Sequence, residues 1–171
     1  MTPLLGSALQ ASPGRRLVLL AMLLALALAL SAFETAVLPP LGVPGAKWGL
    51  ANIVTLLLLV KLGFSAALAV AAVRVILVSF FAGSFLGLGF WLSAAGALVS
   101  LVVMWALLRS GGFSLLGISV AGAVSHNLAQ LGTYSIVVGS SGVFYLLPPL
   151  LLVSLLTGAV TGMAVKKLRQ Y

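Results

Sequence analysis

The sequence has no cysteine and only one acidic residue, Glu34, among its 171 residues. Without cysteine, disulfides and thiolate chemistry are excluded. Without a second carboxylate, the chain cannot assemble a two-carboxylate acid–base pair or a carboxylate-held magnesium site. The only histidine, His126, cannot form a metal site alone, because such sites usually need three or more protein ligands. We therefore predict no catalytic residues, no metal and no cofactor.

Charge of either sign is scarce. Charged residues make up 6% of the chain and hydrophobic residues 63%, and the mean hydropathy is +1.31. Soluble domains carry about 25% charged residues, so this composition indicates a membrane protein. The net charge of +8 would suggest nucleic-acid binding in a soluble chain. No basic run with interleaved aromatic residues is present, however, and we predict no nucleic-acid partner.

Apolar runs separated by proline- and glycine-rich breaks predict the architecture. A cleaved signal peptide is an alternative for the first run, but its length of more than twenty residues exceeds the usual 7–15 of a signal core. We therefore predict an all-α, six-helix integral membrane bundle in one domain, 15–171, after a disordered tail, 1–14. The expected spans are about 17–38, 48–61, 65–82, 90–108, 113–138 and 144–165.

The basic residues predict the orientation of the bundle. With six spans, seven cations fall on one side and Lys47 alone falls on the other. By the positive-inside rule the first side is cytoplasmic, so we predict a multi-pass cell-membrane protein with both termini in the cytoplasm. The seven cations are Arg15, Arg16, Lys61, Arg109, Lys166, Lys167 and Arg169.

The fifth run carries a stripe of polar side chains. Successive helical residues turn by about 100°, which places the stripe on one narrow face. Polar groups at mid-membrane depth are costly unless they face protein, water or a ligand. We interpret the stripe as a wall of a substrate site; the alternative is interhelical polar contacts, worth about 0.6 kcal/mol each. Its members are Ser119, His126, Gln130 and Thr133, with Asn127 at the edge.

Arg74 lies near the middle of the third run. A central arginine disfavours membrane insertion by about 2.5–3.5 kcal/mol, so it must face the bundle, where it could hold an anion. The alternative is a structural pair with Glu34, which could also pair with Lys47. Glu34 and Lys47 are themselves candidate substrate-binding residues, because either a structural pair or contact with the ligand would compensate the desolvation of the carboxylate. Asn52 and Thr55, on one face of the second run, either line the same cavity or bond neighbouring helices.

Alanine recurs every fourth residue in the first run, at Ala21, Ala25 and Ala29. Small residues at this spacing allow another helix to approach closely, so this face either packs internally or docks a partner protein. The chain has no Walker-type phosphate loop. If transport requires ATP, another chain must supply it.

Several stretches resemble the Gx transporter family, also labelled heptaprenyl diphosphate synthase component I. That family is similar to the substrate-binding subunits of energy-coupling factor transporters, which are small six-helix proteins with an alanine-rich first helix. The resemblance covers roughly 17–168 and implies an uptake subunit that works with a coupling membrane protein and separate ATPases. The stretches that carry it are PGAKWGLANIV at 44–54, RVILV at 74–78 and SVAGAVSHNLAQ at 119–130.

These observations lead to a hypothesis of solute capture from the outer side. Arg74 would counter an anionic group, His126, Asn127 and Gln130 would supply hydrogen bonds, and the loop 39–47 would close over the pocket. Two alternatives stay open. One is a noncatalytic membrane accessory of isoprenoid synthesis, since prenyl-elongating enzymes carry aspartate-rich motifs and this chain has no aspartate. The other is a stand-alone carrier or channel.

Overall fold

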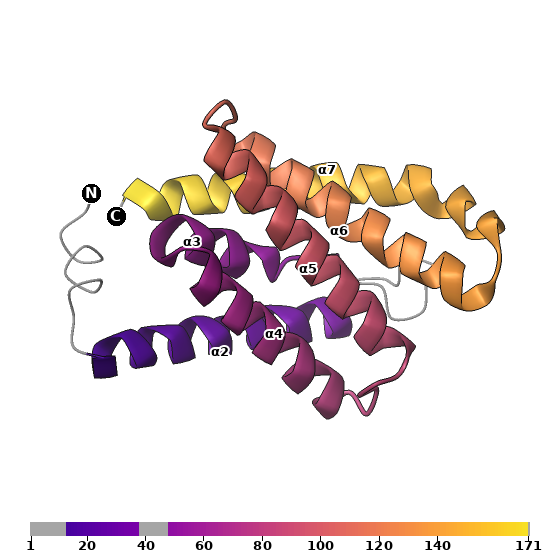
Figure 1. Ribbon diagram of the computed structural model, residues 1–171, viewed down its shortest axis with the longest axis horizontal. Coiled ribbons are helices and arrows are strands. Elements are labelled where there is room, and N and C mark those ends of the chain that lie inside the picture. The colour runs from indigo at the N-terminus through magenta and orange to yellow at the C-terminus, as the bar shows by residue number, and fades with distance from the viewer. Residues whose placement is uncertain (1–12, 38–47, 171) are drawn as a thin grey trace.

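The computed structural model describes residues 13–37 and 48–170, and this part of the chain is all-helical with no strand, as predicted (Figure 1). Short turns join the helices, and a 3-10 helix, η1 (Ser141–Leu146), precedes the last one. The six α-helices of the described ranges are α2 (Pro13–Val37), α3 (Asn52–Leu62), α4 (Phe64–Phe81), α5 (Leu88–Ser110), α6 (Leu115–Val138) and α7 (Leu147–Gln170).

Four of these elements are long and apolar enough to cross a membrane, namely α2, α4, α5 and the η1–α7 stretch. The 23 residues of α5, for example, extend for about 35 Å, against a hydrocarbon core of about 30 Å. By contrast, α3 has 11 residues and reaches only about 16 Å. The remaining helix, α6, has 24 residues but carries the polar stripe. Residues 13–37 and 48–170 thus form six α-helices as predicted, and four elements there have the length and composition of full spans.

Two helix starts differ by four residues from the sequence-based boundaries, more than the other four do. Helix α2 begins at Pro13, so Pro13 and Gly14 are helical and not part of a tail, in keeping with the preference of proline for the first turn. Helix α3 begins at Asn52 and not at Trp48, because Gly49 has a φ of +87° and starts a turn. The rest of the expected tail and the loop 39–47 lie outside the described residues.

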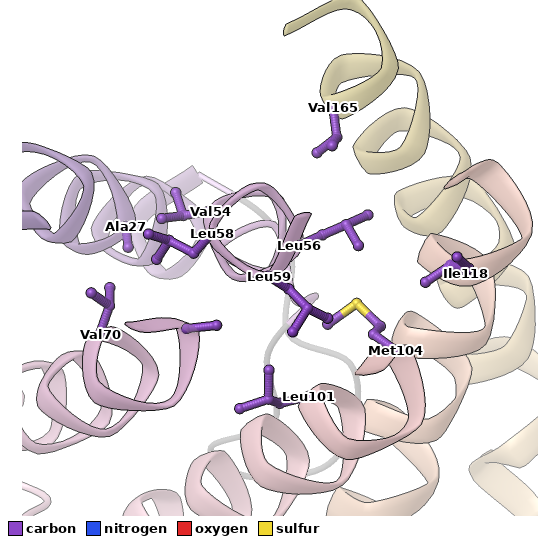
Figure 2. Close-up of a cluster of buried hydrophobic side chains, with 11 residues drawn as sticks. Ala27, Val54, Leu56, Leu58, Leu59, Val70, Leu101, Met104, Ile118 and Val165 are labelled. Carbon is purple, nitrogen blue, oxygen red and sulfur yellow. The ribbon is translucent and has the colours of Figure 1, made fainter. Parts of the chain in front are cut away.

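The apolar core is organised around the short helix α3. Its side chains Val54, Leu56, Leu58 and Leu59 are buried, and residues from every other helix surround them (Figure 2). Helix α3 therefore lies inside the bundle and not at its lipid-facing perimeter. The surrounding residues drawn in Figure 2 include Ala27 of α2, Val70 of α4, Leu101 and Met104 of α5, Ile118 of α6 and Val165 of α7.

Glycines bring α5, α6 and α7 into close contact. A Cβ on Gly158 of α7 would lie 2.6 Å from the Cα of Val120, and one on Gly162 would lie 2.8 Å from the Cα of Leu116. This is the small-xxx-small pattern that lets membrane helices pack backbone to backbone. A Cβ on Gly122 of α6 would similarly meet the side chain of Met104 at 2.6 Å.

The basic residues gather at one end of the bundle. The first turn of α2, the last turns of α3 and α7 and the α5–α6 turn all lie toward the left of Figure 1. At this end Arg109 lies over the ring of Trp105, 5.2 Å from its centroid. The opposite end of the α4–α5 hairpin carries a chain of aromatic contacts that runs through Phe80, Phe85, Phe90 and Trp91. Amphipathic aromatic rings commonly mark membrane–water interfaces.

Candidate functional site

A small polar cavity lies inside the bundle, where α2, α4, α5 and α6 meet the turn before α3. Its volume is about 10 Å³, close to the minimum that holds one water molecule. Among the described residues, the charged groups in its wall are one acid and one base, both predicted site residues. The lining residues are Ser31, Glu34, Gly49, Arg74, Val75, Val78, Ser93 and His126.

Arg74 and Glu34 are both buried, with 7% and 3% of their surface exposed. They line the same cavity, and the Glu34 carboxylate acts electrostatically on the guanidinium of Arg74. Glu34 is the only acidic side chain in the sequence, so no other acidic side chain can pair with that guanidinium. A guanidinium has five donors, so this buried cation retains capacity for an oxygen-rich anion. Of the two predicted partners of Glu34, Arg74 lies in the cavity and Lys47 lies outside the described residues.

The turn before α3 is tied to α2 through Glu34. The backbone N–H of Gly49 donates a hydrogen bond to the Glu34 carboxylate. Gly49 has a left-handed φ, and a Cβ there would lie 3.2 Å from Nδ2 of Asn52 and 3.9 Å from Cδ2 of His126. The absence of a side chain at Gly49 therefore brings the turn, Asn52 and His126 together at one wall of the cavity.

His126 enters the cavity from α6 and packs against α5. A Cβ on Gly96 would lie 2.8 Å from Cε1 of His126, so the imidazole ring occupies the space that a side chain at Gly96 would need. The ring Nε2 lies 3.1 Å from Nε2 of Gln130, one turn along α6. Gln130 is buried but does not line the cavity, so it positions the imidazole.

Two buried polar groups near the cavity have no hydrogen-bond partner among the described atoms. They are the side-chain amide of Asn52 and the hydroxyl of Ser93, which are 4% and 6% exposed. Unsatisfied buried polar groups are costly and need an explanation such as a bound water or ligand. Sequence reasoning missed Ser93 and also Ser31. The recurrence of small and polar residues on one face of α5, at Ser93, Gly96 and Ser100, could have indicated that this face lines the cavity.

Other predicted residues lie elsewhere. Asn127 of α6 donates from Nδ2 to Oγ of Ser154, at 2.8 Å, and to the carbonyl of Leu150, at 3.4 Å, so it joins α6 to α7 and does not line the cavity. Thr55 and Ser119 are buried and likewise outside its wall, and Thr133 is partly buried. Ala21, Ala25 and Ala29 of α2 are exposed on the bundle surface.

These features define the class of protein: an all-helical membrane protein with a polar cavity, in which no group of three potential metal ligands occurs among the described residues. Residues 23–168 match the family described as heptaprenyl diphosphate synthase component I, and the chain belongs to that family. No curated protein and no solved structure matches it.

Proposed function

We propose that the protein is the membrane-embedded substrate-binding subunit of an energy-coupling factor uptake transporter, and that it captures a small anionic or polar solute. The observation that carries this proposal is Arg74, a buried cation that lines a cavity inside the bundle. Keeping a charge at this depth is costly, and intramembrane ionisable residues are functional by default. Asn52 and His126 would orient the solute.

The position of Arg74 along α4 supports capture from the outer side. Arg74 lies about 10 Å along the helix axis from Phe81 and about 15 Å from Phe64. The Phe64 end is the one at which the basic residues gather, and the positive-inside rule would place that end in the cytoplasm. The cavity would then lie in the outer half of a cell membrane, with both termini on the cytoplasmic side.

The cavity must widen before a solute can enter, because its present volume suits one water molecule. Helix α2 is the wall best suited to move. Its buried residues are Ala27, Ser31 and Glu34, and beside it lies a groove of about 540 Å³ toward α4 that shares Ser31 and Val78 with the cavity. Displacement of α2 would join this groove to Arg74.

The exposed alanine face of α2 supports docking to a coupling membrane subunit. Ala21, Ala25 and Ala29 offer a surface of small side chains on which another helix can pack closely. ATPase subunits would supply the energy. In this role the chain itself is not an enzyme, consistent with its single carboxylate.

Affinity purification from native membranes tests this proposal. We expect the full chain to retain two ATPases, a larger membrane protein and a small solute that native mass spectrometry detects. Arg74→Gln should lower the amount of bound solute by at least tenfold. Arg109→Gln is the matched control, because Arg109 lies at a helix end over Trp105. Equal solute retention by wild type and Arg74→Gln would overturn the binding role.

A second candidate function is that of a noncatalytic membrane accessory in isoprenoid synthesis. The family description favours it, since a component I implies a second component that carries the chemistry. Co-purification of a soluble prenyl transferase, without ATPases, would support this role over transport. If mutation of the basic residues at the helix ends abolishes that co-purification and Arg74→Gln does not change it, the protein anchors the soluble enzyme to the membrane.

A further inference from the structure

A second, apolar crevice lies beside the polar cavity, between α4 and α5. Its volume is about 240 Å³, and its walls are almost entirely aliphatic. Leu68, Ile76 and Leu98 in its wall are substantially exposed, so the crevice opens toward the lipid side of the bundle. The described residues that line it along α4 extend from Leu68 to Ile76, and those along α5 from Phe90 to Leu101.

One residue separates the crevice from the cavity. Val75 lines both, and its neighbour Arg74 lines the cavity only. The same division occurs on α5, where Ser93 faces the cavity and Ala94 faces the crevice. A buried cation and an unpartnered buried hydroxyl therefore lie immediately beside an apolar channel that leads to lipid.

We propose that the solute captured at Arg74 is an anionic amphiphile with a single hydrocarbon chain, which enters from the bilayer and lays its chain in the α4–α5 crevice. This inference deepens the proposed binding function and rests on it. The phosphate or carboxylate head pairs with Arg74, because a guanidinium binds either oxyanion through two parallel hydrogen bonds. Ser93 donates a further hydrogen bond to the head.

The geometry explains why the hydrocarbon chain of the ligand would lie in the crevice and not in the polar cavity. The polar cavity must widen to admit the head, as it must for any solute, whereas the crevice of about 240 Å³ already offers apolar space for a hydrocarbon chain. From Val75 the lining of the crevice continues along α4 to Leu68 and along α5 to Leu101, away from the Phe81 end of α4. The chain thus keeps an apolar environment along its whole length while the head is held inside the protein.

Alkyl phosphates of different chain length test this inference. The full-length protein is placed in phosphatidylcholine nanodiscs and titrated with dodecyl phosphate, dodecanoate, dodecanol or butyl phosphate, with bound probe measured by native mass spectrometry. We expect dodecyl phosphate or dodecanoate to bind at least tenfold more tightly than dodecanol. Comparing these two anions identifies the preferred head.

Filling the crevice should discriminate by chain length. Ala94→Phe should weaken binding of the dodecyl anion at least tenfold and change butyl phosphate binding less than twofold. Ala72→Phe fills the crevice from the opposite wall, at an exposed position, and provides the same test if Ala94→Phe does not fold. Val160→Phe, on the exposed face of α7, is the matched control.

The outcomes separate this inference from the function on which it rests. Suppose that Arg74→Gln weakens the binding of butyl and dodecyl phosphate equally and that the crevice variants change the binding of neither. The ligand is then a small anion, so the amphiphile proposal is overturned and the proposed binding function stands. If Arg74→Gln changes no probe, the binding function is overturned as well. Equal binding of dodecanol and both dodecyl anions would identify ordinary lipid occupancy and would overturn the amphiphile.

Discussion

Helices α6 and α2 have nearly the same length but are held in very different ways. Helix α6 buries eight of its 24 residues and lies so close to α7 that Gly158 and Gly162 leave no room for a Cβ. Helix α2 buries three of its 25 residues, and two of these, Ser31 and Glu34, are polar. Helix α6 is fixed by backbone-to-backbone packing. Helix α2 is held by partly buried leucines at the edge of the core and by Ser31 and Glu34, which also line the cavity.

This difference indicates a division of roles within the bundle. The α5–α6–α7 part holds His126 at a fixed position against Gly96. Across the cavity, Glu34 contacts the Gly49 turn and acts on Arg74, so a ligand that competes for Arg74 would also weaken the attachment of α2. Under the proposed function, binding at the site and displacement of α2 would be coupled through the same few polar groups.

The largest expected effect on stability is in the closely packed α6–α7 pair, at Gly158. Gly158→Val places two methyl groups against the Val120 backbone, which cannot move away, and should destabilise the fold by about 3 kcal/mol. The measurement is the midpoint temperature of unfolding in detergent. Gly132→Ala is the control, because no atom lies within 4 Å of the Cβ that it adds on α6. Substitutions without such contacts usually change the free energy of unfolding by no more than about 0.5 kcal/mol, so the midpoint should stay within about one or two degrees of wild type. Equal midpoints for the two variants would refute the proposed packing.

On the loosely held side, Gly49→Ala should cost about 1–3 kcal/mol, because alanine must adopt the left-handed φ. Gly63→Ala is the matched control, since Gly63 has the same φ of +87° but no neighbour within 4 Å. Any excess loss in Gly49→Ala over Gly63→Ala measures the contact with Asn52 and the tie to Glu34. Identical unfolding midpoints for the two variants would mean that this turn does not hold α2.

A charge change should sharpen the comparison further. Glu34→Gln keeps an acceptor for the Gly49 N–H but removes the negative charge that acts on Arg74. We expect about a tenfold gain in affinity for an anionic probe such as dodecyl phosphate, equivalent to about 1.4 kcal/mol, because the guanidinium loses a competing anion. Binding that falls in Glu34→Gln would show instead that the carboxylate contacts the ligand.

The smallest expected effect is at the Asn127–Ser154 contact within the closely packed α6–α7 pair. Ser154→Ala removes one buried interhelical hydrogen bond and should cost about 0.6 kcal/mol. Ser125→Ala, whose hydroxyl bonds the Gly122 carbonyl of its own helix, is the control and should change stability less. If Ser154→Ala destabilises as much as Gly158→Val, polar contacts and not glycine packing hold α6 to α7.

The helices could be predicted from the sequence because membrane spans require long apolar runs, and prolines such as Pro148 and Pro149 mark a first turn. The convergence of Arg74, Glu34 and His126 on one cavity followed from the cost of polar groups in lipid. The direction of the Asn127 side chain could not be predicted in this way. One residue of offset from His126 rotates a side chain by about 100° around the helix, and Asn127 therefore points to another helix. Ser93 was missed because a serine in an apolar helix commonly bonds its own backbone.

The contact between Gly96 and His126 has an evolutionary consequence. The imidazole fills the volume that a side chain on α5 would otherwise take, so the two positions cannot enlarge independently. Homologues with alanine or a bulkier residue at position 96 should therefore replace the histidine with something smaller. Covariation of positions 96 and 126 across the family would identify members in which the cavity has a different shape and, under the proposed function, binds a different ligand.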